Sequence, residues 1–126
     1  MEIIIRNTSD QPLYAQIAGQ IKAQILSGTL RTGDALPSIR ALARDLRVSV
    51  ITTKRAYDEL EAEGYVETLA GRGCFVAEKD LEPARESRRR EMEAHLTAAV
   101  GLAKECGVER SELEELLNLF WEEETP

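Results

Sequence analysis

Two short amphipathic helices joined by a tight turn are the sequence feature that most constrains this fold. Ser38 is a suitable N-cap for the first helix, whose apolar residues recur on one side: Ile39, Leu42, Ala43 and Leu46. Arg47 and Val48 leave room only for a tight turn before Ser49, which caps the second helix. The predicted inward residues of that helix, which ends at Gly64, are Thr53, Ala56, Tyr57 and Leu60. This pattern predicts a helix-turn-helix.

A further amphipathic helix precedes this pair. Pro12 is expected at its first position, where the missing N–H of proline costs nothing, and Gly28 ends it. One apolar stripe repeats every four residues: Leu13, Ile17, Ile21 and Ile25. Residues 33–37 then form a turn, and the β-branched run at residues 3–5 is expected to form a short strand.

Two β-like runs follow the helix-turn-helix. They span residues 65–69 and 74–77 and flank the glycine-containing turn at residues 71–73, a pattern that predicts a hairpin. Three helices followed by a hairpin are the order of a winged helix. The expected fold class is therefore mainly α with a small β-hairpin wing.

The composition changes after the hairpin. Residues 78–90 are rich in charge and include Pro83, so we expect a domain boundary near residue 79. The division is then a winged-helix domain over 1–79 and a helical tail over 80–126. Gly107 separates two helices in this antiparallel tail, and Ser111 with Glu114 forms a capping box that opens the second.

The tail helices carry more apolar groups than they can bury against each other. This excess predicts a partner surface, and we interpret the tail as the dimerisation element of a homodimer. The residues expected at that interface are Met92, Leu96, Val100, Leu113, Leu117, Phe120 and Trp121.

The formal net charge of −7 is unevenly distributed. Residues 1–79 hold 10 basic and 10 acidic side chains, whereas residues 80–126 hold 6 and 13. Residues 31–57 carry six basic side chains against two acidic ones. A polyanion senses this local surplus, because screening limits the field to about 8 Å at physiological salt.

Several functional classes find no support in the sequence. Phosphate loops, catalytic triads and metal-ligand clusters do not occur, so neither enzyme activity nor a cofactor is expected. His95 is interpreted as a surface or interface residue, and residues 122–124 as a solvated acidic terminus. The chain lacks a long apolar run and a signal-peptide pattern, so a cytoplasmic location without membrane contact is expected. Cys74 and Cys106 are expected to be reduced thiols.

The groove side of the second helix-turn-helix helix offers polar groups near its start. Helix-turn-helix proteins read base edges mainly with this part of the helix. Arg40 is placed for a phosphate or a guanine edge, with a surface ion pair to Asp34 or Asp45 as the alternative. The glycines at the hairpin turn permit close approach to a DNA backbone. The candidate DNA-binding residues are Arg40, Arg44, Ser49, Thr52, Lys54, Arg55, Gly71 and Arg72.

The aromatic residues permit another interpretation. Tyr57, Tyr65 and Phe75 form a possible base-stacking set for single strands or RNA. Their positions on inward faces favour core packing instead.

The residues of this region also carry a family resemblance. The runs at 36–43, 48–49, 55–57, 60–65 and 71–76 resemble the GntR family of regulators, and the short two-helix tail resembles its YtrA-like subgroup. The resemblance covers about residues 10–77 and implies a DNA-binding regulator. Members of the subgroup dimerise through such tails and often repress transporter operons.

By the same resemblance, several positions match DNA contacts in relatives: Arg40, Ser49, Thr52 and Lys54, with residues 70–71 at the wing tip. Arg47 stands where many relatives have glycine, so either the turn differs or Arg47 is left-handed. Val50 and Ile51 are apolar where several relatives carry polar base-reading groups, and methyl contacts to thymine are one interpretation.

These observations favour a homodimeric, sequence-specific DNA-binding repressor that recognises a two-fold symmetric duplex operator. The alternative is a winged-helix module for protein–protein contact, whose basic groups are merely solvated. The existence of a small-molecule effector is left open.

Overall fold

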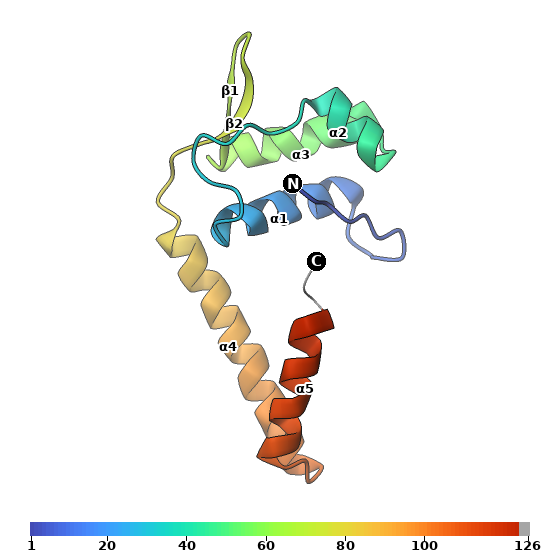
Figure 1. Ribbon diagram of the computed structural model, residues 1–126, viewed down its shortest axis with the longest axis vertical. Helices are drawn as coiled ribbons and strands as arrows, with labels where there is room; N and C mark the ends of the chain where they lie inside the picture. The colour runs from blue at the N-terminus through green and yellow to red at the C-terminus, as the bar shows by residue number, and fades with distance from the viewer. Residues whose placement is uncertain (124–126) are drawn as a thin grey trace. The chain divides into compact units, whose positions relative to one another are not determined.

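The computed structural model describes residues 1–123, and the chain divides into two compact units. The first unit spans Met1–Leu81 and the second begins at Glu82. The first contains α1 (Leu13–Leu26), α2 (Ile39–Leu46), α3 (Val50–Ala62), β1 (Val66–Leu69) and β2 (Gly73–Val76), and the second contains α4 (Glu82–Glu105) and α5 (Arg110–Glu123) (Figure 1). The predicted fold class is confirmed.

The two serine caps predicted for the helix-turn-helix are both present. The Ser38 hydroxyl accepts the Ala41 N–H at 3.1 Å, and the Ser49 hydroxyl accepts the Thr52 N–H at 3.0 Å. Each bond satisfies a donor that a helix N-terminus leaves unpaired. Pro12 differs slightly from expectation, because it precedes α1 as the cap residue and Leu13 is the first helical residue.

One core joins the three helices of the first unit to the hairpin. The predicted inward residues of α3 are all buried, and Thr53, Ala56 and Leu60 have no exposed surface. Ala56 and Leu60 lie in one hydrophobic cluster with Ile17 and Ile21 of α1, which are also fully buried. Burying a side chain of this kind stabilises the fold by about 1.5–3 kcal/mol. The shared core fixes α3 against α1 and α2.

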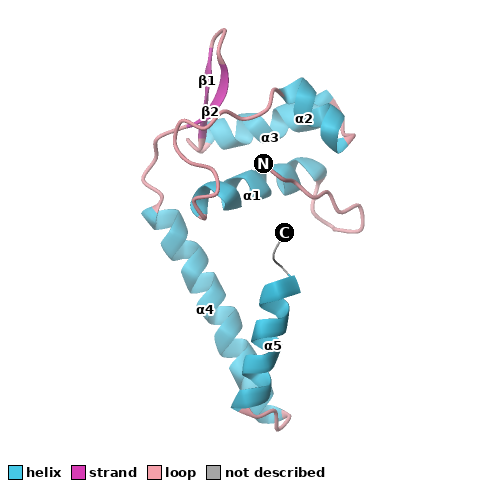
Figure 2. Ribbon diagram, viewed as in Figure 1, coloured by secondary structure: helices cyan, strands magenta, loops and turns pink. Residues whose placement is uncertain are grey.

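The wing is an antiparallel hairpin, as predicted. Figure 2 shows its two strands, β1 and β2. Their register runs from the pair Val66 and Val76 to the pair Leu69 and Gly73. Residues 33–36, which were expected only to turn, also pair with the free edge of β2 through an isolated bridge between Ala35 and Phe75. Backbone bonds at 2.9 Å on either side of this bridge hold the start of α2 beside the wing.

The predicted strand at residues 3–5 is wrong. This segment is extended, but glutamine side chains of α1 replace a partner strand. Gln16 exchanges two hydrogen bonds with the backbone of Arg6, and Gln20 exchanges two with the backbone of Ile4. Gln24 donates to the Glu2 carbonyl at 2.6 Å.

The spacing of these glutamines explains the match. Four residues of helix rise about 6 Å, and two residues of extended chain advance about 6.6 Å. Successive glutamines therefore bond to every second residue of the segment, one glutamine to each. The intervening Ile3 and Ile5 pack against the core.

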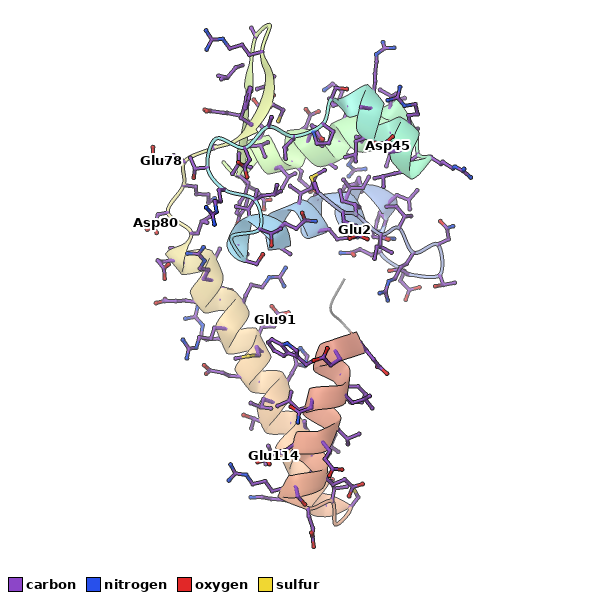
Figure 3. All side chains as sticks on the ribbon, viewed as in Figure 1. Glu2, Asp45, Glu78, Asp80, Glu91 and Glu114 are labelled. Atoms are coloured by element: carbon purple, nitrogen blue, oxygen red, sulfur yellow. The ribbon has the colours of Figure 1, made fainter. Side chains whose placement is uncertain are left out.

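The second unit is a helical hairpin, in which residues 106–109 connect α4 to α5 (Figure 2). Helix α4 begins at Glu82, well before the apolar repeat, with Pro83 in its first turn where a missing N–H is tolerated. The predicted capping box is wrong, since α5 begins at Arg110 and Ser111 already lies inside the helix. Acidic side chains occur along both helices, such as Glu91 on α4 and Glu114 on α5 (Figure 3). Of the predicted acidic terminus, Glu124 lies outside the described residues.

No helix within residues 1–123 has the length and apolar character needed to cross a membrane. Both cysteines are free thiols: Cys74 is half-buried and Cys106 is exposed. His95 is exposed on α4. The aromatic residues Tyr57 and Tyr65 are buried, which confirms the core-packing interpretation for them.

Gln16 offers a test of the glutamine contacts. We expect Gln16→Ala to lower the free energy of unfolding by about 1–3 kcal/mol, because three bonds to this nearly buried side chain are lost. Gln20→Ala is the matched control, whose bonds are exposed to water and whose loss costs less. Urea denaturation measures both. Equal stability of the two variants would contradict this account.

Candidate nucleic-acid interface

The face of α3 opposite the core is open to solvent. Val50 is 47% exposed and Ile51 is 81% exposed in its first turn. Thr52 is partly exposed and linked to the helix cap, because the Ser49 hydroxyl donates to the Thr52 hydroxyl at 2.8 Å. The hydroxyls predicted to face DNA therefore lie side by side at the start of α3.

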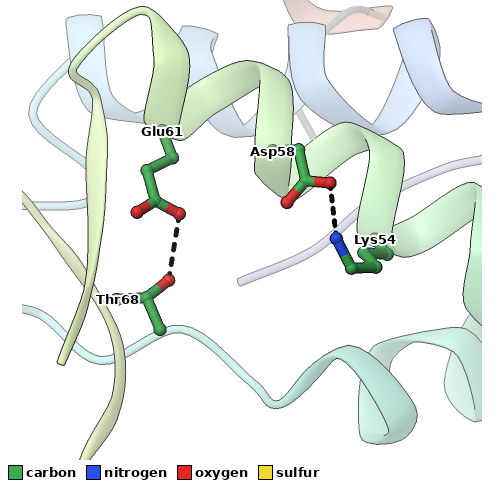
Figure 4. A network of polar contacts seen from close by, with 4 residues as sticks. All are labelled: Lys54, Asp58, Glu61 and Thr68. Carbon is green, nitrogen blue, oxygen red and sulfur yellow. Dashed lines mark hydrogen bonds and ion pairs between the residues drawn. The ribbon is translucent and has the colours of Figure 1, made fainter. Parts of the chain in front are cut away.

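Lys54 continues this face one turn further on. Its ammonium group donates to Asp58 at 2.7 Å, and both side chains are more than half exposed (Figure 4). Such an exposed pair contributes little to stability, about 0.3–0.5 kcal/mol. The ammonium group can therefore exchange its carboxylate partner for a phosphate at small cost.

Two arginines of α2 lie in solvent near this helix. Arg40 is exposed in the first turn of α2 and makes no ion pair within residues 1–123. The alternative partners predicted for it bond elsewhere: Asp34 accepts the Arg31 N–H at 2.8 Å, and Asp45 lies 4.0 Å from Arg44. Arg40 therefore remains available to a ligand.

The wing tip consists of residues 70–72. Gly71 in the tip and Gly73 at the start of β2 both have positive φ. The Arg72 N–H donates to the Leu69 carbonyl at 2.9 Å and closes the turn. A side-chain bond of 3.1 Å from Thr68 to Glu61 ties the wing to α3 (Figure 4). The wing and α3 thus form one connected surface.

Arg55 is separated from this group of residues. Its guanidinium lies 3.7 Å from the centre of the Tyr14 ring of α1, in a cation–π contact. This contact joins α3 to α1. Asp58 and Glu61 were not predicted as part of the outer face, although their spacing from Lys54 at i+4 and i+7 indicates it.

Arg47 adopts the left-handed conformation, the second of the two alternatives expected for this turn. Its φ and ψ angles are 57° and 44°, and it is the only non-glycine residue with positive φ among residues 1–123. The Val48 N–H donates to the Ala43 carbonyl at 3.0 Å, which closes the C-terminus of α2. The turn sets the angle at which α3 leaves α2.

Tyr57 fixes the same pair of helices from within. Its hydroxyl donates to the Pro37 carbonyl at 2.8 Å, just before α2. Burial raises the pKa of this hydroxyl, and the proton is needed for the bond. Burial likewise raises the pKa of the Cys74 thiol on β2. Neither group carries a charge near neutral pH, so the positive charge of the interface comes from its arginines and Lys54.

A helix-turn-helix with a hairpin wing and an exposed α3 defines a winged helix-turn-helix DNA-binding transcription regulator. Residues 13–76 match the family described as bacterial regulatory proteins, gntR family. The chain belongs to this family, as its sequence motifs indicated. Members of the family are regulators of transcription and not enzymes.

Individual relatives agree with this assignment. The chain is 37% identical over 107 residues to the HTH-type transcriptional repressor YtrA of Bacillus subtilis, covering 85% of this chain and 82% of that one. The solved structure of YtrA from Sulfolobus acidocaldarius, a GntR-family transcription factor, is 34% identical with a TM-score of 0.59, covering 79% and 97%. AraR(DBD) in complex with operator ORX1 is 26% identical with a TM-score of 0.54, covering 61% and 96%.

The strain at Arg47 is open to measurement. We expect Arg47→Gly to raise the free energy of unfolding by about 0.5 kcal/mol, because relief of the left-handed strain exceeds the entropy cost of glycine. Arg44→Gly is the matched control, and it should lower stability by about 1 kcal/mol, since Arg44 is inside α2. Thermal or urea denaturation compares them. Destabilisation of similar size in both variants would contradict the strain at Arg47.

Proposed function

We propose that this chain is a homodimeric repressor that binds a two-fold symmetric operator. Helix α3 enters the major groove, and the wing contacts the adjacent minor groove or backbone. The observation that carries this proposal is the exposed first turn of α3, together with an exposed Arg40 that makes no ion pair within residues 1–123. The similarity to AraR(DBD), which has been solved with an operator, supports duplex DNA as the ligand.

The proposed contacts divide by chemistry. Arg40, Ser49, Thr52 and Lys54 lie on or beside α3, where side chains reach base edges and nearby phosphates. The amide groups of the first turn of α3 carry partial positive charge, which favours a phosphate. Arg44 and Arg72 supply contacts to the backbone or the minor groove. Of the proposed residues, Arg55 has the least support as a DNA contact, because its guanidinium lies over the Tyr14 ring.

The dimer is proposed to form through the tail. None of the side chains of α4 and α5 is buried, although both helices carry an apolar face. A groove of about 670 Å³ lies between them and is lined mainly by apolar residues, including Leu96, Val100, Leu113, Leu117 and Phe120. A second copy of the tail would remove this surface from water.

Dimerisation would also define the operator. Two α3 helices in successive major grooves require half-sites whose centres lie about 34 Å apart, one turn of duplex. Linking two weak sites raises the overall affinity without any new contact. The tail thereby contributes to DNA binding without touching DNA.

Selection of bound genomic fragments, followed by gel-shift measurements, tests the proposal. A specific fragment with a two-fold symmetric sequence, bound by two chains, would support it. A protein that binds no fragment above the non-specific level would instead favour a winged-helix module for protein contact. Reporter transcription from the selected site then distinguishes repression from activation.

The assigned DNA face makes a first prediction. Arg40→Ala and Thr52→Ala should each weaken operator binding by about 1–3 kcal/mol if they contact bases. Arg72→Ala should weaken specific and non-specific binding alike, because a backbone contact reads little sequence. Arg6→Ala removes the same charge from the exposed N-terminal segment and is the control. Gel shifts on operator and random duplex measure the effects. Unchanged affinity in all three variants would show that the face is wrong.

The tail makes a second prediction. We expect Leu117→Ala and Phe120→Ala to shift the dimer toward monomer and to weaken operator binding together, because each removes apolar area from the groove. Glu115→Ala, on the same helix and outside the groove, is the control. Sedimentation and gel shifts give the two readouts. A parent chain that stays monomeric at micromolar concentration, with operator binding intact, would refute the tail dimer.

A further inference from the structure

The first turn of α3 exposes two branched apolar side chains to water. Ile51 is 81% exposed, the highest value among the large hydrophobic residues of the first unit, and Val50 beside it is 47% exposed. Neither belongs to the hydrophobic core or to the residues packed against it. Helix α3 buries its other side through Thr53, Ala56, Tyr57 and Leu60.

Local stability does not account for this pair. β-branched residues lose side-chain freedom in a helix, so Val50 and Ile51 weaken the start of α3 relative to straight-chain residues. The helix is already capped by Ser49. Packing and helix propensity therefore both leave the two side chains unexplained.

The polar neighbours are bonded within the helix, whereas the apolar pair is not. The Ser49 hydroxyl donates to Thr52 at 2.8 Å while it accepts the Thr52 N–H at 3.0 Å. Lys54 is paired with Asp58 at 2.7 Å. Val50 and Ile51 thus project into solvent and do not pack against the core.

The major groove offers one apolar feature to such side chains. Among the base edges exposed there, only thymine presents a methyl group, at its C5 position, and the others present hydrogen-bond donors and acceptors. We propose that Val50 and Ile51 read thymine methyl groups and make them a sequence requirement of each half-site. This inference rests on the proposed function, in which α3 enters the major groove.

The geometry limits the number of thymines read. Consecutive helix residues differ by about 100° in direction and 1.5 Å in rise, so the two side chains reach neighbouring base pairs and not one shared position. Arg40 on α2 and Lys54 on α3 supply positive charge, which attracts the DNA phosphate backbone toward this turn. The pair therefore specifies one or two adjacent thymines in each half of the operator.

Replacement of thymine by deoxyuridine tests the inference, because it removes only the C5 methyl group. In a selected operator, each thymine is replaced in turn and the full-length protein is titrated. We expect a loss of about three- to fivefold in affinity at one or two positions per half-site, the effect of one buried methyl group. Replacement at all other thymines should leave the affinity unchanged.

Variants assign the effect to these side chains. Ile51→Ala and Val50→Ala should bind thymine and deoxyuridine operators equally at the position that each residue reads, which a merely structural role would not produce. Ile4→Ala removes a residue that is also half-exposed, outside α3, and should retain the preference for thymine. Operator binding without any sensitivity to deoxyuridine would overturn this inference and leave the proposed function intact. If no fragment is bound specifically, both the proposed function and this inference are wrong.

Discussion

The burial of one face of α3 is the constraint on which the rest of the interface depends. Ala56 and Leu60 have no exposed surface, and the core they share with α1 fixes the rotation of α3 about its own axis. This orientation turns Val50 and Ile51 toward solvent. Replacing a buried leucine such as Leu60 by alanine typically lowers the free energy of unfolding by about 2–5 kcal/mol. The packing of the buried face therefore keeps the helix in this orientation although two apolar side chains remain exposed.

Three further contacts attach neighbouring elements to this helix. The left-handed Arg47 sets the angle between α2 and α3, and Tyr57 bonds to the carbonyl just before α2. Thr68 bonds to Glu61, so the wing is joined to the outer side of the same helix. Because all three contacts converge on α3, they fix the positions of α2 and the wing relative to this helix.

The charge of the chain follows the same division of roles. The acidic excess is confined to residues 80–126, and the basic surplus lies in residues 31–57. On α4 and α5, ion pairs such as Arg88 with Glu91 and Arg110 with Glu114 neutralise part of the charge locally. Salt screens charges beyond about 8 Å, so an acidic chain can still present a basic surface to DNA.

The sequence by itself determined the helices, both serine caps, the tight turn and the wing, because each depends on residues within a few positions of one another. It also indicated the family and the exposed apolar pair. Only the tertiary structure decided that glutamines of α1 hold residues 2–6, that residues 33–36 pair with β2, and that Arg55 stacks on Tyr14. These contacts join segments distant in sequence. The four-residue spacing of the glutamines places them on one face of α1 but does not show which segment they bind, and the loop and the arginine carry no pattern that identifies their partners.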